Sequence, residues 1–142
     1  MDQTKHPGIS FDTVLLKELS FTREMEMLVQ PKLDLRFKHS YAISPEKNIL
    51  RYDLSCILKD TKGSFSIFCT MTGVFSIFPG FENMELEFFA QNNAPALLLP
   101  YIREIISSTT LKSGIMPLIL PPLNIQAMMS EQAPEQPQPE KS

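Results

Sequence analysis

The first half of the chain alternates between apolar and polar side chains, and this pattern restricts its fold more than any other feature. Segments 33–37, 50–58 and 65–77 place apolar residues at every second position, with few exceptions. Segment 9–21 follows the same alternation less strictly. A period of two puts alternate side chains on one face of a β-strand. The sequence therefore predicts four strands, each with one apolar face.

The first of these strands has an irregular pattern. Five apolar residues share one parity and are expected on the buried face: Ile9, Phe11, Leu15, Leu19 and Phe21. Val14 and Leu16 break that parity, so a regular alternation does not account for them.

Short polar segments separate the last three strands. Asp60-Thr61-Lys62-Gly63 is a strong hairpin signal between the third and fourth strands, and segment 44–48 is a polar turn between the second and third. Strands joined in this way form an antiparallel sheet with one apolar and one polar face. The apolar face requires a cover, which the second half of the chain has to supply.

An apolar helix is predicted from Pro95 onward, because proline is well tolerated in a first helical turn. Pro100 removes a backbone hydrogen bond, so it is expected to bend this helix or to set its true start. Gly114 is the expected C-terminal stop, and segment 82–89 is a candidate for a shorter helix upstream. The long helix carries one apolar stripe at helical spacing, formed by Leu98, Tyr101, Ile102, Ile105, Ile106 and Thr109.

Three prolines, Pro117, Pro121 and Pro122, interrupt the apolar segment 115–123 that follows, here called the crossover. They exclude a regular helix or a central strand there, and a brief helix is expected at 123–129. The predicted fold class is α+β. It combines a four-stranded antiparallel sheet of Greek-key-like order with a long helix, a proline-rich crossover and a short terminal helix.

The chain is expected to form one domain over residues 9–129. Residues 1–8 are predicted to be a flexible N-terminus. Residues 130–142 are rich in proline, glutamine and glutamate and contain no large apolar residue, so they are predicted to be a disordered acidic tail.

Composition excludes several classes of function. The net charge of −3, from 13 basic and 16 acidic residues, argues against nucleic acid as the main partner. No stretch approaches the roughly 20 apolar residues of a membrane-spanning helix, and residues 1–8 are polar and unlike a secretory leader. We therefore expect a cytoplasmic protein without membrane insertion.

Cys56 and Cys69 fall in alternating apolar strands, where free thiols pack as small apolar side chains. Nothing near them in the sequence supplies the electropositive surroundings of a reactive thiol. His6 and His39 are distant, and the four residues do not have the spacing of a zinc site. The five glycines are dispersed and form no nucleotide-binding motif. The sequence thus predicts no metal and no cofactor.

Five short segments, in this order, resemble the SecB family of protein-export chaperones. They are Lys17-Glu18-Leu19-Ser20-Phe21, Lys32-Leu33-Asp34-Leu35, Gly73-Val74-Phe75-Ser76-Ile77, the helix Pro95–Ser108, and Leu120-Pro121-Pro122-Leu123-Asn124. The similarity extends over about residues 9–129. It implies a homotetramer, a dimer of dimers, that holds unfolded preproteins without ATP and passes them to the export motor SecA.

Clients of such a protein are expected in grooves lined by the second strand, the long helix and the crossover. A physical argument points the same way, because an irregular, proline-stiffened segment cannot bury all its side chains against one sheet. Plain core packing accounts for the crossover equally well. The positions that the resemblance assigns to client binding are Leu33, Leu35, Phe37, Leu97, Ile115, Met116, Leu118, Leu120 and Leu123.

The resemblance also implies two protein contacts. Ile67, Cys69 and Met71 match positions of the family's dimer–dimer contact, although apolar inward residues are equally expected in the core of a single subunit. The contact with SecA is expected at Glu18, Glu24, Glu26 and Phe68. Here the chain departs from the family pattern, since Thr22 and Phe68 stand at acid positions and Ser66 at an apolar one.

Three other functions compete with preprotein holding. One is a SecB-like chaperone that stabilises the antitoxin of a toxin–antitoxin pair. Another is a hot-dog-like enzyme or ligand carrier, for which the long helix offers Arg103 and Glu104 but no histidine. A third is an assembly subunit without clients. Because the sequence shows no catalytic set, it predicts a binding protein and not an enzyme.

Overall fold

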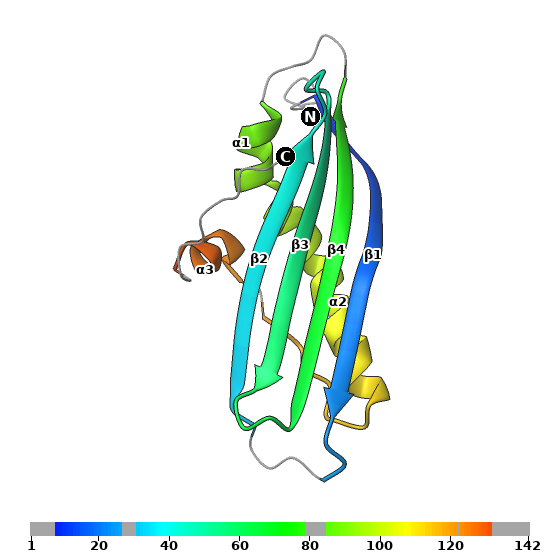
Figure 1. Ribbon diagram of the computed structural model, residues 1–142, viewed down its shortest axis with the longest axis vertical. Helices are drawn as coiled ribbons and strands as arrows, with labels where there is room; N and C mark the ends of the chain where they lie inside the picture. The colour runs from blue at the N-terminus through cyan, green and yellow to red at the C-terminus, as the bar shows by residue number, and fades with distance from the viewer. Residues whose placement is uncertain (1–7, 27–30, 79–84, 122, 132–142) are drawn as a thin grey trace.

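The computed structural model (Figure 1) describes residues 8–26, 31–78, 85–121 and 123–131, and it has the α+β fold that the sequence predicts. The expected flexible segment 1–8, except Gly8, and the expected tail beyond residue 131 lie outside these residues. The elements are β1 (Ile9–Arg23), β2 (Leu33–Ile43), β3 (Ile49–Asp60), β4 (Phe65–Ile77), α1 (Leu86–Asn92), α2 (Ala94–Lys112) and α3 (Ile125–Glu131).

The four strands form one antiparallel sheet in the order β1-β4-β3-β2. The strands β2, β3 and β4 are joined as successive hairpins, and β1 lies beside β4, so the order is that of a Greek key. Figure 1 shows β1 and β2 at opposite edges of the sheet. The predicted Greek-key-like sheet is therefore confirmed, and its first two strands are not neighbours.

The turn between β3 and β4 is organised around Asp60, as the hairpin signal predicts. Gly63 has a φ of 87°, which suits glycine, and its N–H donates to the Asp60 carbonyl at 2.8 Å. The Asp60 carboxylate accepts hydrogen bonds from the Ser64 hydroxyl and, at 2.9 Å, from the Lys32 N–H that precedes β2. These bonds, led by the one from Ser64, hold the pKa of Asp60 below its usual range.

Two β-bulges explain the broken alternation of β1. The pairing of β1 with β4 shifts by one residue between Phe11 and Thr13 and again between Leu16 and Glu18. Each shift reverses the direction in which the following side chains point. In the middle of β1, even-numbered side chains therefore face the side of the sheet that odd-numbered side chains face at both ends.

The inversion corrects one expectation and accounts for two exceptions. Val14 and Leu16 pair with Gly73 and Met71, so they lie on the sheet face that the helices cover, here called the helix face. Leu15 pairs with Thr72 and lies on the opposite, outer face. The expectation that Leu15 shares the buried face with Ile9 and Phe21 is wrong, because a parity count assumes one unbroken register along the strand; the break at Val14 and Leu16 is the trace that the bulges leave in the sequence.

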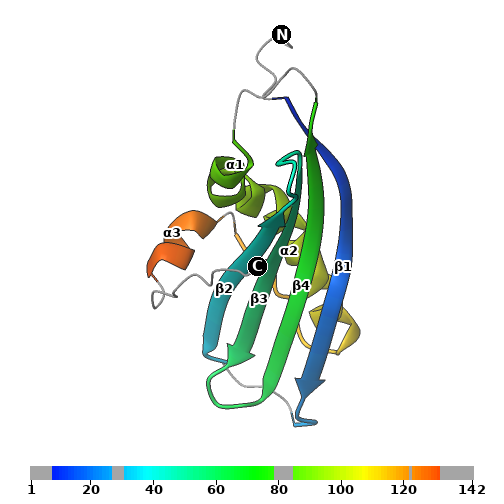
Figure 2. The same cartoon turned by 45° about the horizontal axis from the view of Figure 1, so that its top comes forward.

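The long helix α2 covers the helix face over β3 and β4 (Figure 2). Pro95 lies in its first turn, while Pro100 is exposed inside the helix and does not set its start. Tyr101 is exposed and Thr109 only half-buried, so the buried stripe differs from the expected one. It consists of Ala94, Pro95, Leu98, Leu99, Ile102, Ile106 and Thr110.

The two short helices lie toward the β2 edge. Helix α1 contacts β2 and β3, and α3 contacts β2 and α2. The expected helix at 82–89 is shifted, because α1 begins at Leu86 and ends at Asn92, and residues 82–84 lie outside the described part of the chain. The β2 edge of the sheet is thus covered by the two short helices, whereas the contact shown at β1 is that of Phe11 with Tyr101 of α2.

Candidate functional site

The crossover runs back along α2 and is held to it by hydrogen bonds. The N–H groups of Ile115 and Leu118 donate to the carbonyl and the hydroxyl oxygen of Thr110, at 3.2 and 2.9 Å. Farther along, Nε of Arg103 donates to the Leu120 carbonyl at 3.2 Å. An irregular segment has no ladder to satisfy its backbone groups, so these bonds fix its path.

Thr110 is the anchor of this arrangement, and the sequence pattern missed it. Its side chain is fully buried, and its hydroxyl donates to the Ile106 carbonyl at 2.9 Å while accepting from Leu118. The helical spacing favoured Thr109, one residue earlier. A threonine near the end of an apolar helix, followed by a proline-containing segment, is the only sequence signal that points to such a role.

The backbone anchoring leaves two large apolar side chains of the crossover in water. Met116 is 80% exposed and Ile119 is 77% exposed, whereas Leu120 is buried at 8%. Leu118 packs partly against the core. Ile119 was not among the expected client-binding residues, although it fits that role better than Leu120.

The nine residues expected to bind clients fall into three groups. Leu33, Leu97 and Met116 are exposed; Leu35, Ile115, Leu118 and Leu123 are half-buried against the core; Phe37 and Leu120 are buried. The nine residues therefore differ widely in exposure, and their role in client binding stays a prediction.

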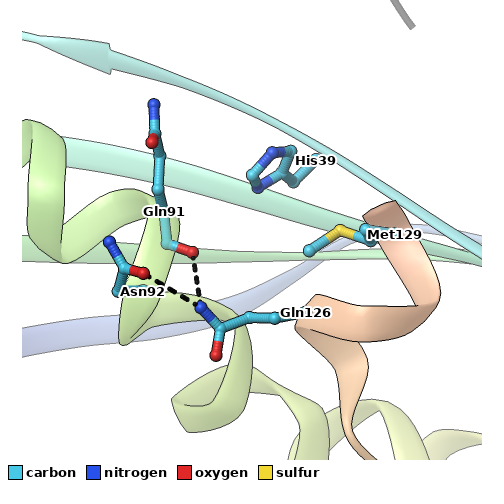
Figure 3. Close-up of a pocket in the computed structure, with 5 residues that line it drawn as sticks. All are labelled: His39, Gln91, Asn92, Gln126 and Met129. Atoms are coloured by element: carbon cyan, nitrogen blue, oxygen red, sulfur yellow. Dashed lines mark hydrogen bonds between the residues drawn. The ribbon is translucent and has the colours of Figure 1, made fainter. Parts of the chain in front are cut away.

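A pocket of about 330 Å³ lies where β2, α1 and α3 meet (Figure 3). His39, Gln91, Asn92, Gln126 and Met129 line it. Nε2 of Gln126 donates to the Gln91 carbonyl at 3.0 Å and to Oδ1 of Asn92 at 3.3 Å, which joins α3 to α1. The amides are neutral donors and acceptors, so the pocket offers hydrogen bonds without a charge. Its residues are too far apart in the sequence to have been recognised as a group.

His39 connects this pocket to the core. Its Nδ1 lies 2.7 Å from the hydroxyl of the buried Tyr52, and its ring stands edge-on to Tyr52 and Tyr41. Burial lowers the pKa of His39, because the charged imidazolium loses hydration there. The neutral ring is therefore the form that the fold favours.

The expected SecA-contact residues separate into two places. Glu18 and Phe68 lie on the outer face, where Glu18 pairs with Thr70 and the half-buried Phe68 lies between Ser20 and Ile57. Glu24 and Glu26 are exposed beyond the end of β1. The role of these four residues in a SecA contact stays a prediction.

Ile67, Cys69 and Met71, the expected dimer–dimer contact, are buried within the single subunit. Among the strand residues of the helix face, the exposed large apolar side chains are Leu33 of β2 and, on β1, Phe11, Leu16 and Leu19. The ring centroid of Phe11 lies 6.3 Å from that of Tyr101 of α2. The interface role of the three buried residues stays a prediction.

The site offers contacts and no arrangement for chemistry. Arg103 is engaged with the crossover backbone and does not form an ion pair with Glu104 in the structure. Within the described ranges, no group of three or more His, Cys, Asp or Glu side chains is placed to hold a metal ion. None of the helices that the structure describes is long and apolar enough to cross a membrane.

Replacing Thr110 by valine tests the crossover anchor with almost no change in volume. The variant leaves the half-buried Leu118 N–H without its acceptor, so we expect the free energy of unfolding to fall by about 1–3 kcal/mol. Thr109→Val is the matched control and should change it by less than about 0.5 kcal/mol. Denaturant unfolding measures both values, and equal stability of the two variants would contradict the anchor.

The lowered pKa of His39 predicts a loss of stability in mild acid. The unfolded chain takes up the proton near the ordinary value of 6.5, and the folded chain only at lower pH. The stabilisation by the neutral ring is therefore complete above pH 6.5 and is lost as the pH falls from there through the folded pKa. His39→Gln, which cannot titrate, should flatten this slope in urea titrations between pH 7.5 and about 5. An identical slope in both proteins would contradict it.

Comparisons with known proteins agree with this architecture. The family described as preprotein translocase subunit SecB matches residues 2–136. A protein-export protein SecB of Orientia tsutsugamushi (strain Boryong) is 26% identical over 92% of this chain and 86% of its own length. A protein-export protein SecB of Azoarcus sp. (strain BH72) is also 26% identical, over 93% of this chain and 92% of its own.

A solved structure shares the fold. It is a SecB-like chaperone of Mycobacterium tuberculosis in complex with a peptide from an antitoxin, and it is 19% identical to this chain. The similarity has a TM-score of 0.68 and covers 82% of this chain and 88% of that one. Because the family match extends over nearly its whole length, the chain belongs to the SecB family of protein-export chaperones.

Proposed function

We propose that this SecB-family chaperone is an ATP-independent holdase that binds unfolded preproteins through the crossover and keeps them competent for export. The observation that carries the proposal is the exposure of Met116 and Ile119 on the crossover, whose backbone is fixed to α2 by hydrogen bonds. Exposed apolar side chains of this size on a fixed backbone form a ready contact for other apolar chains.

The crossover suits clients of varied sequence. Burial of apolar area contributes roughly 25 cal/mol per Å² and requires no particular geometry. Methionine adapts its shape to different partners, while Pro117 and the bonds to Thr110 keep the segment from collapsing onto the core. The affinity would then depend on how much apolar area a client offers, and not on a sequence motif.

The likeness to the Mycobacterium protein supports an extended polypeptide as client, since the fold there holds a peptide. We infer that preproteins fill this role here and that SecA receives them, with Glu18, Glu24, Glu26 and Phe68 as the contact residues. Three of these four are exposed acids, which a basic motor surface would recognise. Preproteins before export are accessible in the cytoplasm, where we place the chaperone.

Charged substitution of the two exposed crossover residues tests holdase activity. Met116→Glu with Ile119→Glu removes two apolar contacts without touching the core, so we expect at least tenfold weaker suppression of aggregation of a slowly refolding protein. Ile49→Glu, an equally polar change at an exposed residue of β3, is the control and should retain full activity. A correctly folded double variant that still protects its client at near-stoichiometric ratio would refute the proposed surface.

We further propose that the chain assembles into a homotetramer, a dimer of dimers, through apolar residues left exposed on β1. Leu16 and Leu19 are 41% and 43% exposed on the helix face, beside Phe11 and Tyr101. Residues Ile67, Cys69 and Met71 underlie this surface from β4. If another copy of the chain covers Leu16 and Leu19 in an assembly, their apolar area is removed from water.

The two faces of β1 supply a matched test of assembly. Leu16→Glu with Leu19→Glu places charges on the helix face, and light scattering should then give a smaller particle than for the unmodified chain. Leu15→Glu is the control, because Leu15 is 47% exposed but lies on the outer face. Equal particle mass for all three proteins, or a single-subunit mass for the unmodified chain, would rule out this interface.

A further inference from the structure

The two cysteines of the chain lie directly opposite each other on adjacent strands. Cys56 of β3 and Cys69 of β4 are paired residues in the antiparallel register. Opposite residues of such a pair have Cα atoms about 4.5 or 5.5 Å apart, depending on the type of pair. Both distances fall within the range of roughly 4.4–6.8 Å that a disulfide requires. The strands therefore already hold the two cysteines at bonding separation.

The side chains also point the same way. Paired residues share one face of the sheet, and Cys56 and Cys69 share the helix face, where both are free thiols and fully buried. The two thiols are hydrogen-bonded to each other. The sequence alone predicted unreactive thiols, because nothing near them supplies electropositive surroundings. The register adds that the two residues face each other across the hairpin.

In a single subunit, where the β1 edge is not covered by the proposed assembly, oxidants have a short path to this pair. On the other side of Cys69 its neighbour is Leu19 of the edge strand β1, a residue that is 43% exposed. A β-bulge lies between Leu16 and Glu18, next to that position, and a bulge locally disrupts the hydrogen-bond ladder. Opening of one edge strand at its weakest point therefore exposes Cys69 before Cys56.

The mutual hydrogen bond makes the two thiols chemically different. The bond from Cys56 lowers the pKa of Cys69, against the effect of burial, and the same bond together with burial raises the pKa of Cys56. Cys69 is the thiol that neighbours the edge strand β1, and the thiolate is the nucleophile, so we assign to Cys69 the attack on the oxidant and to Cys56 the resolution of the product.

We propose that Cys56 and Cys69 form a redox-active dithiol that hydrogen peroxide converts into a disulfide joining β3 to β4. The Cys69 thiolate attacks one peroxide oxygen, the O–O bond breaks, and the hydroxide released takes up the thiol proton as water. The Cys56 sulfur then attacks the sulfenic acid sulfur of Cys69, the S–O bond breaks, and the hydroxide leaves with the Cys56 proton as a second water. Two thiols are oxidised by two electrons, and one peroxide is reduced.

The bond would tie together the two central strands of the sheet. It would close the hairpin over the turn at Asp60 and so restrict the unfolded chain, which stabilises the folded state as long as the bond is unstrained. The oxidised protein should therefore unfold at a temperature several degrees higher, on the order of 5 °C for a chain of this size. This inference is independent of client binding.

Peptide mapping of the full chain after exposure to hydrogen peroxide tests the proposal. Intact mass is uninformative, because eight methionines also take up oxygen. The expected product is a peptide pair linked through Cys56 and Cys69 that dithiothreitol separates, together with the rise in unfolding temperature. Incubation for hours about 10 °C below the unfolding temperature allows edge-strand opening to occur.

Two serine variants separate the roles of the thiols. Cys56→Ser should accumulate a dimedone-reactive sulfenic acid at Cys69, whereas Cys69→Ser should react at least tenfold more slowly at Cys56. Loss of folding in either variant would not affect the linkage test on the unmodified chain. Two free thiols after incubation, or sulfinic and sulfonic acids without a linked peptide, would overturn the proposal.

Discussion

Packing of α2 against β3 and β4 determines which of the other apolar surfaces of this molecule are buried and which remain exposed. A single helix is narrower than a four-stranded sheet, so Leu98, Ile102 and Ile106 can cover the centre of the helix face but not both edges. The β2 edge is covered by α1 and α3. The β1 edge receives no comparable cover from the described elements, which leaves Leu16 and Leu19 in water.

The crossover shows how exposure can be built into a stable fold. Its backbone is fixed by Thr110 and Arg103, and these bonds use groups that an irregular segment could otherwise satisfy only with water. Because the backbone is fixed, the side chains cannot all turn inward, and Met116 and Ile119 remain outside. A flexible segment of the same composition would be free to collapse onto the core. The fixed backbone of the crossover therefore keeps its apolar side chains exposed.

Much of the fold was predictable because periodicity depends only on local order. The alternation in β3 and β4, the turn at Asp60 and the helix after Pro95 are each visible within a dozen residues. The errors came from features that depend on the partner strand or helix. The face of Leu15 depends on pairing with β4, and the choice between Thr109 and Thr110 depends on where the crossover returns.

The site was less predictable than the fold for the same reason. The resemblance to SecB pointed to the crossover as a whole, but it could not distinguish the buried Leu120 from the exposed Ile119 in a stretch that is apolar throughout. The amide-lined pocket joins residues from β2, α1 and α3, which are separated by up to 90 positions between His39 and Met129. Only the folded arrangement brings such residues together.

The paired bulges of β1 have a consequence for how this strand can vary in length. Each bulge adds one residue, so the two together restore the original parity, and Ile9 and Phe21 face the helices as they would in a regular strand. Losing both extra residues would straighten β1 without turning either end around. Relatives could therefore differ by two residues in the middle of this strand and still bury the same ends, whereas a change of one residue would turn one end to the opposite side of the sheet.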